Sequence, residues 1–377
     1  MTAAHQCDVL VIGAGPGGAS AALTLLNHSN LSVTVLEQSD LQKMRVGESV
    51  SSSLFATLDY LQLPRQRFTP ECFSATQGSS AYWGSDTAAN RHAIFAPDRA
   101  TFQVDREVFD LTLLEAVDNR GGSILPRCKC KQVKQRSDKQ WQVTAYHPEF
   151  GERTLLAHFI IDASGRSGTI ANMVGARVTQ FDQLMGVGAF FHSPQHTALE
   201  QLQLLESDEN GWWYSAALNH TTLVATYFSD AEQLSEMRLN RVSQWQQQLS
   251  HTQVMATRLA GLSMISNKLW LRPAHSQSTQ FAGVANYLPV GDAACAFDPI
   301  SSMGLGFAMT SGCQAARLIA NEADSGLSAA TQLSYQQDIA QQFQQYSALK
   351  QLFYGKEKRW PHSAFWQRRQ QAAPAVA

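Results

Sequence analysis

The chain has 377 residues, of which 44% are hydrophobic, and its formal net charge is -2 at pH 7. This length predicts two domains, and the near-neutral charge gives no reason to expect a nucleic acid or an anionic membrane as partner. Residues 1–30 lack the charged start of a signal peptide, and glycines interrupt their apolar stretch, so we expect a cytoplasmic protein without a membrane span. The six scattered cysteines are expected to be free thiols, because no second Cys or His pair stands at zinc spacing.

The first predicted unit is the segment DVLVIGAGPGGASAALTLL at residues 8–26. The apolar residues Val9–Ile12 are typical of a buried parallel strand, and the small residues from Ala19 onward predict a helix packed closely against it. A tight glycine-rich turn must join the two elements. A second strand, LSVTVLE at residues 31–37, completes a βαβ unit.

This unit has the spacing of a dinucleotide-binding fingerprint. Gly13 permits the turn, Gly15 lets the backbone approach a pyrophosphate, and Gly18 allows helix and strand to pack closely. Glu37 ends the second strand, nineteen residues after Gly18, where an acid can bind the hydroxyls of the adenosine ribose. The unit therefore predicts dinucleotide binding, and both NAD and FAD fit it.

The middle of the chain alternates helices and strands. Residues 44–64 predict a loop and a helix that ends before Pro64, and residues 103–122 predict an amphipathic helix closed by two glycines. Residues 128–147 predict a hairpin around SDK, and residues 155–168 predict an apolar strand that opens into the turn DASGRSG.

The second half begins with strands that are predicted to form a separate antiparallel sheet. They are MGVGAFFHS, LQLLESDENGWWYSAAL and TLVATYFSD, all between residues 181 and 230. Residues 240–258 predict a helix, residues 264–271 a strand, and residues 281–320 a strand, loop and helix. The Gln-rich sequence near the end predicts an amphipathic helix, because four apolar residues recur at helical spacing: Tyr335, Ile339, Phe343 and Tyr346.

Three motifs far apart in the sequence distinguish between the two nucleotides. The segments DREVFD at 105–110, DASGRSG at 162–168 and GDAACAFDPISSMGLG at 291–306 together resemble the superfamily of FAD-dependent aromatic hydroxylases, geranylgeranyl reductases and flavin halogenases. The resemblance covers nearly the whole chain and implies noncovalent FAD. A second Rossmann domain is not expected, because the glycine pair Gly186 and Gly188 lies in a predicted strand with no helix after it. NAD(P)H would then visit the flavin transiently, or a separate reductase would supply the electrons.

The resemblance implies an α/β (α+β) fold similar to that of p-hydroxybenzoate hydroxylase. A Rossmann-like FAD-binding domain is predicted at residues 1–80, 100–176 and 275–325. It is interleaved with a substrate domain, built on the antiparallel sheet, at residues 81–99 and 177–274. Residues 326–377 are predicted to form a C-terminal helical segment.

The resemblance also implies which residues lie at the flavin. Asp292 would accept from hydroxyls of the ribityl or phosphate-proximal part of FAD, and a helix N-terminus after Pro299 would present free N–H groups to the pyrimidine edge. The segment RVGESV at 45–50 resembles a loop that covers the isoalloxazine ring. The predicted cofactor-binding residues are Gly13, Gly15, Gly18, Glu37, Arg45, Arg106, Asp292, Gly304 and Leu305. No catalytic residue is identified, and the candidates near the flavin are Arg45, Glu48, Pro299, Ser301 and Ser302.

Halogenation and hydroxylation are the two reactions to distinguish. Halogenases carry a lysine beyond the loop that RVGESV resembles, a glutamate in a PLEST-like motif and a WxWxIP signature. This chain departs at all three, with GSSAYWGS at 78–85, PISS at 299–302 and GWWYS at 211–215. Hydroxylation needs less from the protein, namely a dry pocket that orients an electron-rich ring. The sequence therefore favours a monooxygenase.

Aromatic residues of the predicted antiparallel sheet are candidates for the substrate pocket. Trp212 and Tyr214 alternate with Trp213 and so share one face of a strand. Together with Tyr227 on the neighbouring strand they form the predicted pocket wall, although packing within the sheet core is the more ordinary role of such residues. No catalytic base is assigned to the histidines of this region, which are His192, His196 and His220.

Within the superfamily, the sequence is most similar to the flavoproteins that mature lysine ε-oxidase and glycine oxidase by helping to convert a tryptophan into cysteine tryptophylquinone. The segments FDPISSMGLG and GWWYS and the chain length carry this resemblance. It implies oxygen insertion into the indole of a tryptophan in a precursor oxidase, with FAD and O2 as reagents. Two other functions stay open: a small-molecule phenol or indole monooxygenase, and a non-catalytic flavin-bearing chaperone that holds the precursor.

The stretch LKQLFYGKEKRWPHSAFWQRR at residues 349–369 is strongly basic. It carries six Lys and Arg residues against Glu357, with five aromatic residues among them. Aromatic residues and arginine are enriched at interface hot spots. We expect the stretch either to dock the precursor protein beside the flavin pocket or to pack on the FAD domain with its charges in solvent.

Overall fold

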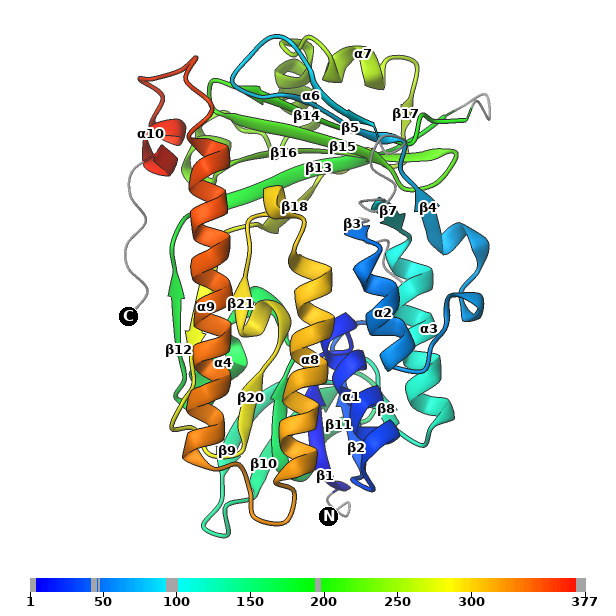
Figure 1. The fold of residues 1–377 in the computed structure, drawn as a ribbon, viewed down its shortest axis with the longest axis vertical. Coiled ribbons are helices and arrows are strands. Elements are labelled where there is room, and N and C mark those ends of the chain that lie inside the picture. The colour runs from blue at the N-terminus through cyan, green and yellow to red at the C-terminus, as the bar shows by residue number, and fades with distance from the viewer. Residues whose placement is uncertain (1–4, 42–45, 47, 93–100, 194–197, 371–377) are drawn as a thin grey trace.

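The computed structural model describes residues 5–41, 46, 48–92, 101–193 and 198–370, and most of its strands lie in two large β-sheets (Figure 1). The lower one in Figure 1, called the nucleotide sheet here, has the strand order β8-β2-β1-β11-β10-β9, with β20 beside β11. β1 pairs in parallel with both β2 and β11, as strands buried on both faces do. The strands of this sheet are β1 (His5–Ile12), β2 (Val33–Leu36), β8 (Ser123–Leu125), β9 (Lys129–Gln135), β10 (Trp141–His147), β11 (Gly151–Asp162) and β20 (Tyr287–Pro289).

Helices from distant parts of the sequence pack together on the nucleotide sheet. α1 (Pro16–His28) contacts both α3 (Arg106–Asn119) and α8 (Gly304–Asn321). Glycines bring α1 and α8 into backbone contact, because a Cβ at Gly312 would lie only 2.3 Å from the carbonyl oxygen of Gly17. The N-terminal βαβ unit is thereby joined directly to the helix that follows the PISS segment.

The upper sheet in Figure 1 has the strand order β17-β13-β16-β15-β14-β5-β6, with β18 beside β13. Its pairs are antiparallel except for β14 with β5. Three helices cover its outer face, α5 (Ala231–Glu236), α6 (Val242–Ser250) and α7 (Met255–Leu259), and its inner face looks toward the nucleotide sheet. The strands are β5 (Gly78–Tyr82), β6 (Ala89–His92), β13 (Leu184–His192), β14 (Leu202–Asp208), β15 (Gly211–Ala217), β16 (Thr222–Asp230), β17 (Ser263–Met264) and β18 (Trp270–Pro273).

Two small sheets and two short helices accompany the two large sheets. One sheet pairs β7 (Thr101–Val104) with both β3 (Glu48–Ser51) and β4 (Phe73–Ala75). The other pairs β19 (Gln277–Gln280) with both β12 (Arg177–Gln180) and β21 (Cys295–Ala296). The helices are α2 (Ser53–Tyr60) and α4 (Thr169–Val174).

Helix α9 (Ala329–Tyr354) runs from the nucleotide sheet to the upper sheet (Figure 1). The four apolar residues predicted at helical spacing form its buried stripe, since each is at most 1% exposed. α10 (Ala364–Gln370) follows at the edge of the upper sheet. There Tyr354, Phe365 and Trp366 pack with Trp212 and Phe228 of that sheet. The predicted packing of this stretch on the FAD domain is therefore wrong for Phe365 and Trp366, which cover the other half, whereas Tyr354 also contacts Asp298 of the predicted FAD domain.

Most cations of the C-terminal stretch are paired within the chain, and the expectation that they lie in solvent is met only by Lys356, Lys358 and Arg368. Arg369 is buried with its Nη2 2.6 Å from Asp230 Oδ1, and Arg368 pairs with the same carboxylate. Arg359 and Lys350 form ion pairs as well. Four of the six Lys and Arg residues are thus neutralised internally, which removes most of the charge on which the docking hypothesis depended.

Two predicted elements are each split in two. Residues 240–258 form α6 and α7, and the strand expected at residues 264–271 is present as the short strands β17 and β18. The domain boundaries stay a prediction. In the part of the chain that the structure describes, no helix has the length and apolar character needed to cross a membrane.

Candidate functional site

A cavity of about 950 Å³ reaches from the carboxyl ends of β1 and β2 to the inner face of the upper sheet. Ligand sites in proteins typically measure about 300–1,000 Å³, so this cavity suits a large ligand. In open α/β sheets, ligands bind outside the carboxyl ends of the strands. The part beside β1 and β2 is called the nucleotide end here, and the part under the upper sheet is called the chamber.

Three glycines shape the nucleotide end. Gly13 has a φ of +113°, and a Cβ there would lie 2.2 Å from the carbonyl oxygen of Ala163. A Cβ at Gly18 would lie 2.0 Å from the carbonyl oxygen of Gly13, so Gly18 allows the close contact of α1 with the turn. Gly15 lines the cavity, and apart from its two chain neighbours no described residue has an atom within 4 Å of a Cβ placed there. This open space at the N-terminus of α1 is suited to a phosphate.

Glu37 lines the same end, and backbone N–H groups hold its carboxylate. Oε2 accepts a hydrogen bond of 2.8 Å from the N–H of Ala14, and Oε1 accepts one of 2.7 Å from the N–H of Ser39. The remaining lone pairs are available to ribose hydroxyls. Ser164, which the sequence analysis did not single out, lies beside Gly13, and its Oγ is buried without a hydrogen-bond partner among the described residues.

Asp292 faces the cavity from the short 3-10 turn Gly291–Ala293. Arg166 holds it, with 3.1 Å between Nε and Oδ2, and also donates to the carbonyl oxygen of Phe297 at 2.8 Å. Arg166 belongs to the DASGRSG motif, yet its task could not be predicted, because its partner stands 126 residues further along the chain.

Three charged residues form a partly buried group where β3 meets α3, in which the Glu48 side chain is 36% exposed. Arg106 makes two hydrogen bonds of 3.0 Å to Asp110 and also pairs with Glu48. Burial opposes the charge of Arg106, but the carboxylates of Asp110 and Glu48 outweigh it and raise the pKa of the guanidinium. Burial raises the pKa of Glu48, and Arg106 offsets this only in part. Glu48 and Arg106 both line the cavity, whereas Arg45 lies outside the described residues.

The start of α8 and the turn before it form one boundary of the cavity. Asp298 caps the 3-10 turn Pro299–Ser301, since its Oδ1 accepts from the N–H of Ile300 at 3.0 Å. The first N–H groups of a helix have no acceptor within the helix, so those of α8 are available to a ligand. The predicted residues that line the cavity here are Pro299, Ser301, Ser302, Gly304 and Leu305.

The residues of the nucleotide end fit FAD. The N-termini of α1 and α8 both border the cavity, so the partial positive charges of two helices meet one ligand. The open space at Gly15 and the unpartnered Oγ of Ser164 are features that a bound nucleotide would complete. Gly15 would lie at the pyrophosphate, Glu37 at the adenosine ribose, and Gly304 at the flavin.

Five aromatic side chains line the chamber: Phe190, Trp212, Tyr214, Phe228 and Trp270. Trp212 and Tyr214 share the inner face of β15, as alternation predicts, and Trp213 packs on the outer face. The prediction for Tyr227 is wrong. Tyr227 stands opposite Trp213 in the strand register, packs with it in the outer core, and donates its hydroxyl to Asp208 at 2.8 Å. Its neighbour Phe228 faces the chamber instead, because successive residues of a strand point to opposite faces.

Two polar atoms of the chamber wall have no partner. The ring of Trp270 lies over Gly188, where a Cβ would be 2.5 Å from it. Nε1 of Trp270 and Oγ1 of Thr226 are buried without a hydrogen bond to any described residue. An unsatisfied buried polar group costs about 1–3 kcal/mol. These two atoms therefore mark places where a ligand can supply the missing partner.

Sequence comparison assigns the chain to a family. The profile of the tryptophan halogenase family matches residues 8–98 and 86–376. The chain belongs to the tryptophan halogenase family. LodB of Marinomonas mediterranea, a protein named as an FAD-dependent oxidoreductase, is 45% identical over 362 residues, which cover 96% of each chain. Membership in this family supports FAD as the cofactor and an oxidoreductase activity.

Solved structures share the architecture. The myxobacterial chondrochloren halogenase CndH has a TM-score of 0.84 at 21% identity, over 98% of this chain and 86% of that one. QhpG, a peptidyl tryptophan dihydroxylase essential for tryptophylquinone cofactor biogenesis, has a TM-score of 0.77 at 21% identity, over 99% of this chain and 80% of that one. These likenesses confirm the predicted mixed α/β fold.

The cavity of this family member has few titratable groups under the upper sheet. Lys129 is the only lysine among the described residues that line the cavity. It lies at the nucleotide end, next to Cys128, whose N–H donates to the carbonyl oxygen of Glu37 at 2.8 Å. None of the described histidines lines the cavity, His192 and His220 included, and His196 lies outside the described residues.

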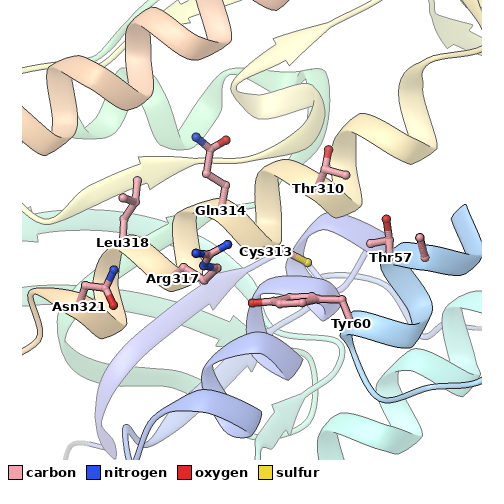
Figure 2. Close-up of a pocket in the computed structure, with 9 residues that line it drawn as sticks. Thr57, Tyr60, Thr310, Cys313, Gln314, Arg317, Leu318 and Asn321 are labelled. Carbon is pink, nitrogen blue, oxygen red and sulfur yellow. The ribbon is translucent and has the colours of Figure 1, made fainter. Parts of the chain in front are cut away.

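A second cavity, of about 540 Å³, lies between α2 and α8 (Figure 2). Tyr60 lies beside Cys313 and Arg317 in it, and Thr57 and Thr310 stand at one side. It contains none of the predicted site residues that the structure describes. The larger cavity is therefore the candidate site for the chemistry of the family.

Proposed function

We propose that this protein is an FAD-dependent monooxygenase that inserts oxygen into the indole ring of a tryptophan side chain, and that this tryptophan belongs to the precursor of a tryptophylquinone oxidase. The observation that carries the proposal is the chamber, where an aromatic wall with unpaired polar atoms shares one cavity with the first turn of α8. Reduced FAD, when bound, supplies activated dioxygen. The task of this chain is to bind FAD, exclude water and hold an electron-rich ring.

The chamber suits an indole. An indole is flat and apolar apart from one N–H donor, and Trp212, Tyr214 and Phe228 offer aromatic contact surface of matching character. Oγ1 of Thr226 is an acceptor without a partner, which fits the indole N–H. Nε1 of Trp270 is a donor without a partner, which fits a carbonyl oxygen of a peptide substrate.

A sequence relative supports an FAD-dependent oxidoreductase, and a structural neighbour supports a protein substrate. LodB shares 45% identity over nearly the full length of both chains. QhpG has the same fold, and its name states that it acts on peptidyl tryptophan for the biogenesis of a tryptophylquinone cofactor. The precursors of lysine ε-oxidase and glycine oxidase, which the sequence resemblance implies, are the candidate substrates.

Hydroxylation fits the described chamber better than halogenation does. β5, in the segment where the halogenases carry lysine, contributes no lysine to the cavity, and Ser301 stands at the position of the PISS segment where the PLEST-like halogenase motif carries glutamate. We propose NAD(P)H as the source of electrons, through a transient visit or through a separate reductase. The second candidate function is a small-molecule phenol or indole monooxygenase, which the aromatic wall also favours.

Intact-mass analysis of a precursor oxidase tests the proposal. The purified protein is mixed with FAD, a reductant, O2 and the precursor, with chloride or bromide present or absent. We expect the precursor to gain oxygen at a tryptophan in every mixture, and to gain none with an FAD-free variant. A halogenated product would overturn the choice of hydroxylation. Oxygen insertion into free indole or phenol, with an unchanged precursor, would select the second candidate.

A further inference from the structure

Three residues on one face of α9 contact the same aspartate. Tyr346, Lys350 and Tyr354 are four residues apart, a spacing that aligns side chains along a helix. The N–H of Asp298 donates to the Tyr346 hydroxyl at 2.8 Å, and the Tyr354 hydroxyl donates to Asp298 Oδ2 at 2.8 Å. Lys350 Nζ lies 3.8 Å from the same Oδ2, and the Asp298 side chain is fully buried. The end of α9 therefore holds this aspartate at three points.

Asp298 also fixes the conformation of the 3-10 turn Pro299–Ser301, which borders the cavity. Its Oδ1 accepts from the N–H of Ile300 at 3.0 Å, and its carbonyl oxygen accepts from the N–H and Oγ of Ser301 at 3.1 and 2.9 Å. Pro299, Ile300 and Ser301 all line the cavity. A displacement of the Asp298 carboxylate would therefore move the turn that leads into α8.

Tyr354 also reaches the opposite wall of the chamber. The indole Nε1 of Trp212 donates to the Tyr354 hydroxyl at 3.0 Å. A phenol hydroxyl can accept one hydrogen bond while it donates another. One buried hydroxyl thus links the aromatic wall of the chamber to the turn at the start of α8.

Other residues hold this hydroxyl in place. The guanidinium of Arg369 lies 5.4 Å from the centre of the Tyr354 ring and is fixed by its ion pair with Asp230. Lys350 is fixed as well, because Nζ lies 2.5 Å from Asp182 Oδ2 and donates to Ser276 Oγ at 2.8 Å. The link between wall and turn therefore belongs to a rigid, buried network and not to a mobile surface contact.

We propose that Tyr354 is a positioning residue, which acts through Asp298 to set the distance between the turn 299–302 and Trp212. This inference rests on the proposed function, because FAD is expected to lie against that turn. Neither the dinucleotide fingerprint nor the family match points to Tyr354, which lies outside the set of residues that line the cavity. Its role is to place other residues, so it is not a catalytic residue.

The variant Tyr354→Phe tests the proposal, because it removes only the hydroxyl. Tyr335→Phe is the matched control, since Tyr335 is buried on the same helix and its hydroxyl donates to the carbonyl oxygen of Pro289 at 3.0 Å. Each variant is titrated with FAD, and the dissociation constant, the visible spectrum of bound FAD and the Tm are recorded. For Tyr354→Phe we expect a dissociation constant raised about three- to tenfold, the equivalent of one hydrogen bond, together with an altered flavin spectrum. Tyr335→Phe is expected to change the Tm alone.

Asp298→Asn tests the route of the effect. Its amide nitrogen cannot accept the hydrogen bond of Tyr354, so the spectral change of Tyr354→Phe should recur. The double variant should add little to either single one, because both remove the same link. If Tyr354→Phe had the same flavin spectrum and FAD affinity as Tyr335→Phe, the inference about Tyr354 would be overturned while the proposed function would stand. A wild-type protein that bound no FAD in the same titration would overturn the proposed function and the inference with it.

Discussion

The nucleotide end and the chamber belong to one cavity but are built from different parts of the chain. The nucleotide end consists largely of backbone, with three glycines, two helix N-termini and a glutamate held by two N–H groups. The chamber consists of large side chains from the upper sheet, and Thr226 and Trp270 bring unpaired polar atoms to it. A ligand that stays the same throughout a superfamily can be recognised through backbone. A ligand that differs between members of the superfamily is recognised through side chains. Some polar atoms of these side chains have no hydrogen-bond partner until that ligand binds.

The two ends of the cavity also differ in which parts of the chain pack against them. The C-terminal stretch packs on the chamber wall, where Trp366 and Tyr354 share a hydrophobic cluster with Trp212 and Phe228. Gly13 and Gly18 of the nucleotide end pack against Ala163, directly after β11, and Gly18 also packs against Val11 of β1, all within the nucleotide half. Damage to the C-terminal stretch should therefore affect the chamber first.

The largest expected effect is a loss of stability when the ion pair of Arg369 with Asp230, which holds the C-terminal stretch on the chamber wall, is removed. Arg369→Leu leaves Asp230, which is 2% exposed, without its buried partner, and should lower the free energy of unfolding by about 3–5 kcal/mol. Arg368→Ala is the control, because its side chain is 48% exposed although it pairs with the same carboxylate, and should cost less than about 1 kcal/mol. Urea unfolding measures both values. FAD affinity under folding conditions should stay unchanged in Arg368→Ala and should fall by at most about three- to tenfold in Arg369→Leu, which loses the contact with the Tyr354 ring. A much larger loss of FAD in Arg369→Leu would break the distinction between the two ends.

Gly15→Val should separate cofactor binding from folding. Apart from its two chain neighbours, no described residue lies near its Cβ position, so the chain can fold, but the side chain would occupy the phosphate space and weaken FAD binding at least about 100-fold. Gly18→Ala is the contrasting variant, since its Cβ would meet the Gly13 carbonyl oxygen at 2.0 Å and should lower the Tm. Flavin absorbance and calorimetry of the purified proteins give the two readouts. Full FAD occupancy in Gly15→Val would refute the assignment of the nucleotide end.

Acid should weaken the network that supports the chamber, through Asp182. Burial opposes its ionisation, but the Lys350 ammonium 2.5 Å away prevails and lowers the pKa of Asp182 from 3.8 to about 2. The stabilisation is therefore complete above the unfolded-state pKa and is lost as the pH falls toward the folded-state pKa. Between pH 6 and pH 3 the loss should be about 1 kcal/mol. Urea unfolding of the wild type and of Asp182→Asn at both pH values measures it, and an equal pH dependence in the two proteins would contradict the prediction.

Thr226→Val should produce the smallest change in stability. The two side chains have nearly the same shape, and the hydroxyl that is lost has no partner among the described residues, so the Tm should stay the same or rise. FAD affinity should not change, because Thr226 lies in the chamber. The KM for the oxidised substrate should rise about three- to tenfold, if the hydroxyl binds the indole N–H. Thr226→Ser, which keeps the hydroxyl, should restore the KM.

The nucleotide end could be predicted from the sequence because its geometry is local. The spacing of the glycines before α1 and the acid at the end of β2 depends on one strand, one turn and one helix. The chamber could be predicted only in part. Tyr227 and Phe228 are adjacent aromatic residues, and the pairing of Phe228 with Trp212 across β15 and β16 decides which of them faces inward. That register is a property of the sheet, and neither strand reveals it alone.

Contacts between charged and polar groups that are far apart in the sequence could not be predicted, for a different reason. Arg166 and Asp292 are 126 residues apart, and Tyr354 and Asp298 are 56 apart, so only the folded chain brings them together. One signal was present in the sequence. Lys350 continues the buried stripe of α9 beyond Tyr346, and a lysine in such a position needs a buried carboxylate as its partner. The sequence could indicate that need, but not that Asp182 and Asp298 would meet it.

The contact of Gly17 with Gly312 has a consequence for biosynthesis. The two glycines bring α1 and α8 together, although α1 is among the first elements to leave the ribosome and α8 is among the last. Closing so long a loop is slow and comes after local structure has formed. The glycine turn before α1 can thus form early, whereas α8 docks only when synthesis is nearly complete. With FAD bound where we propose, between the N-termini of α1 and α8, the amount of bound FAD would report how many of these chains have finished folding.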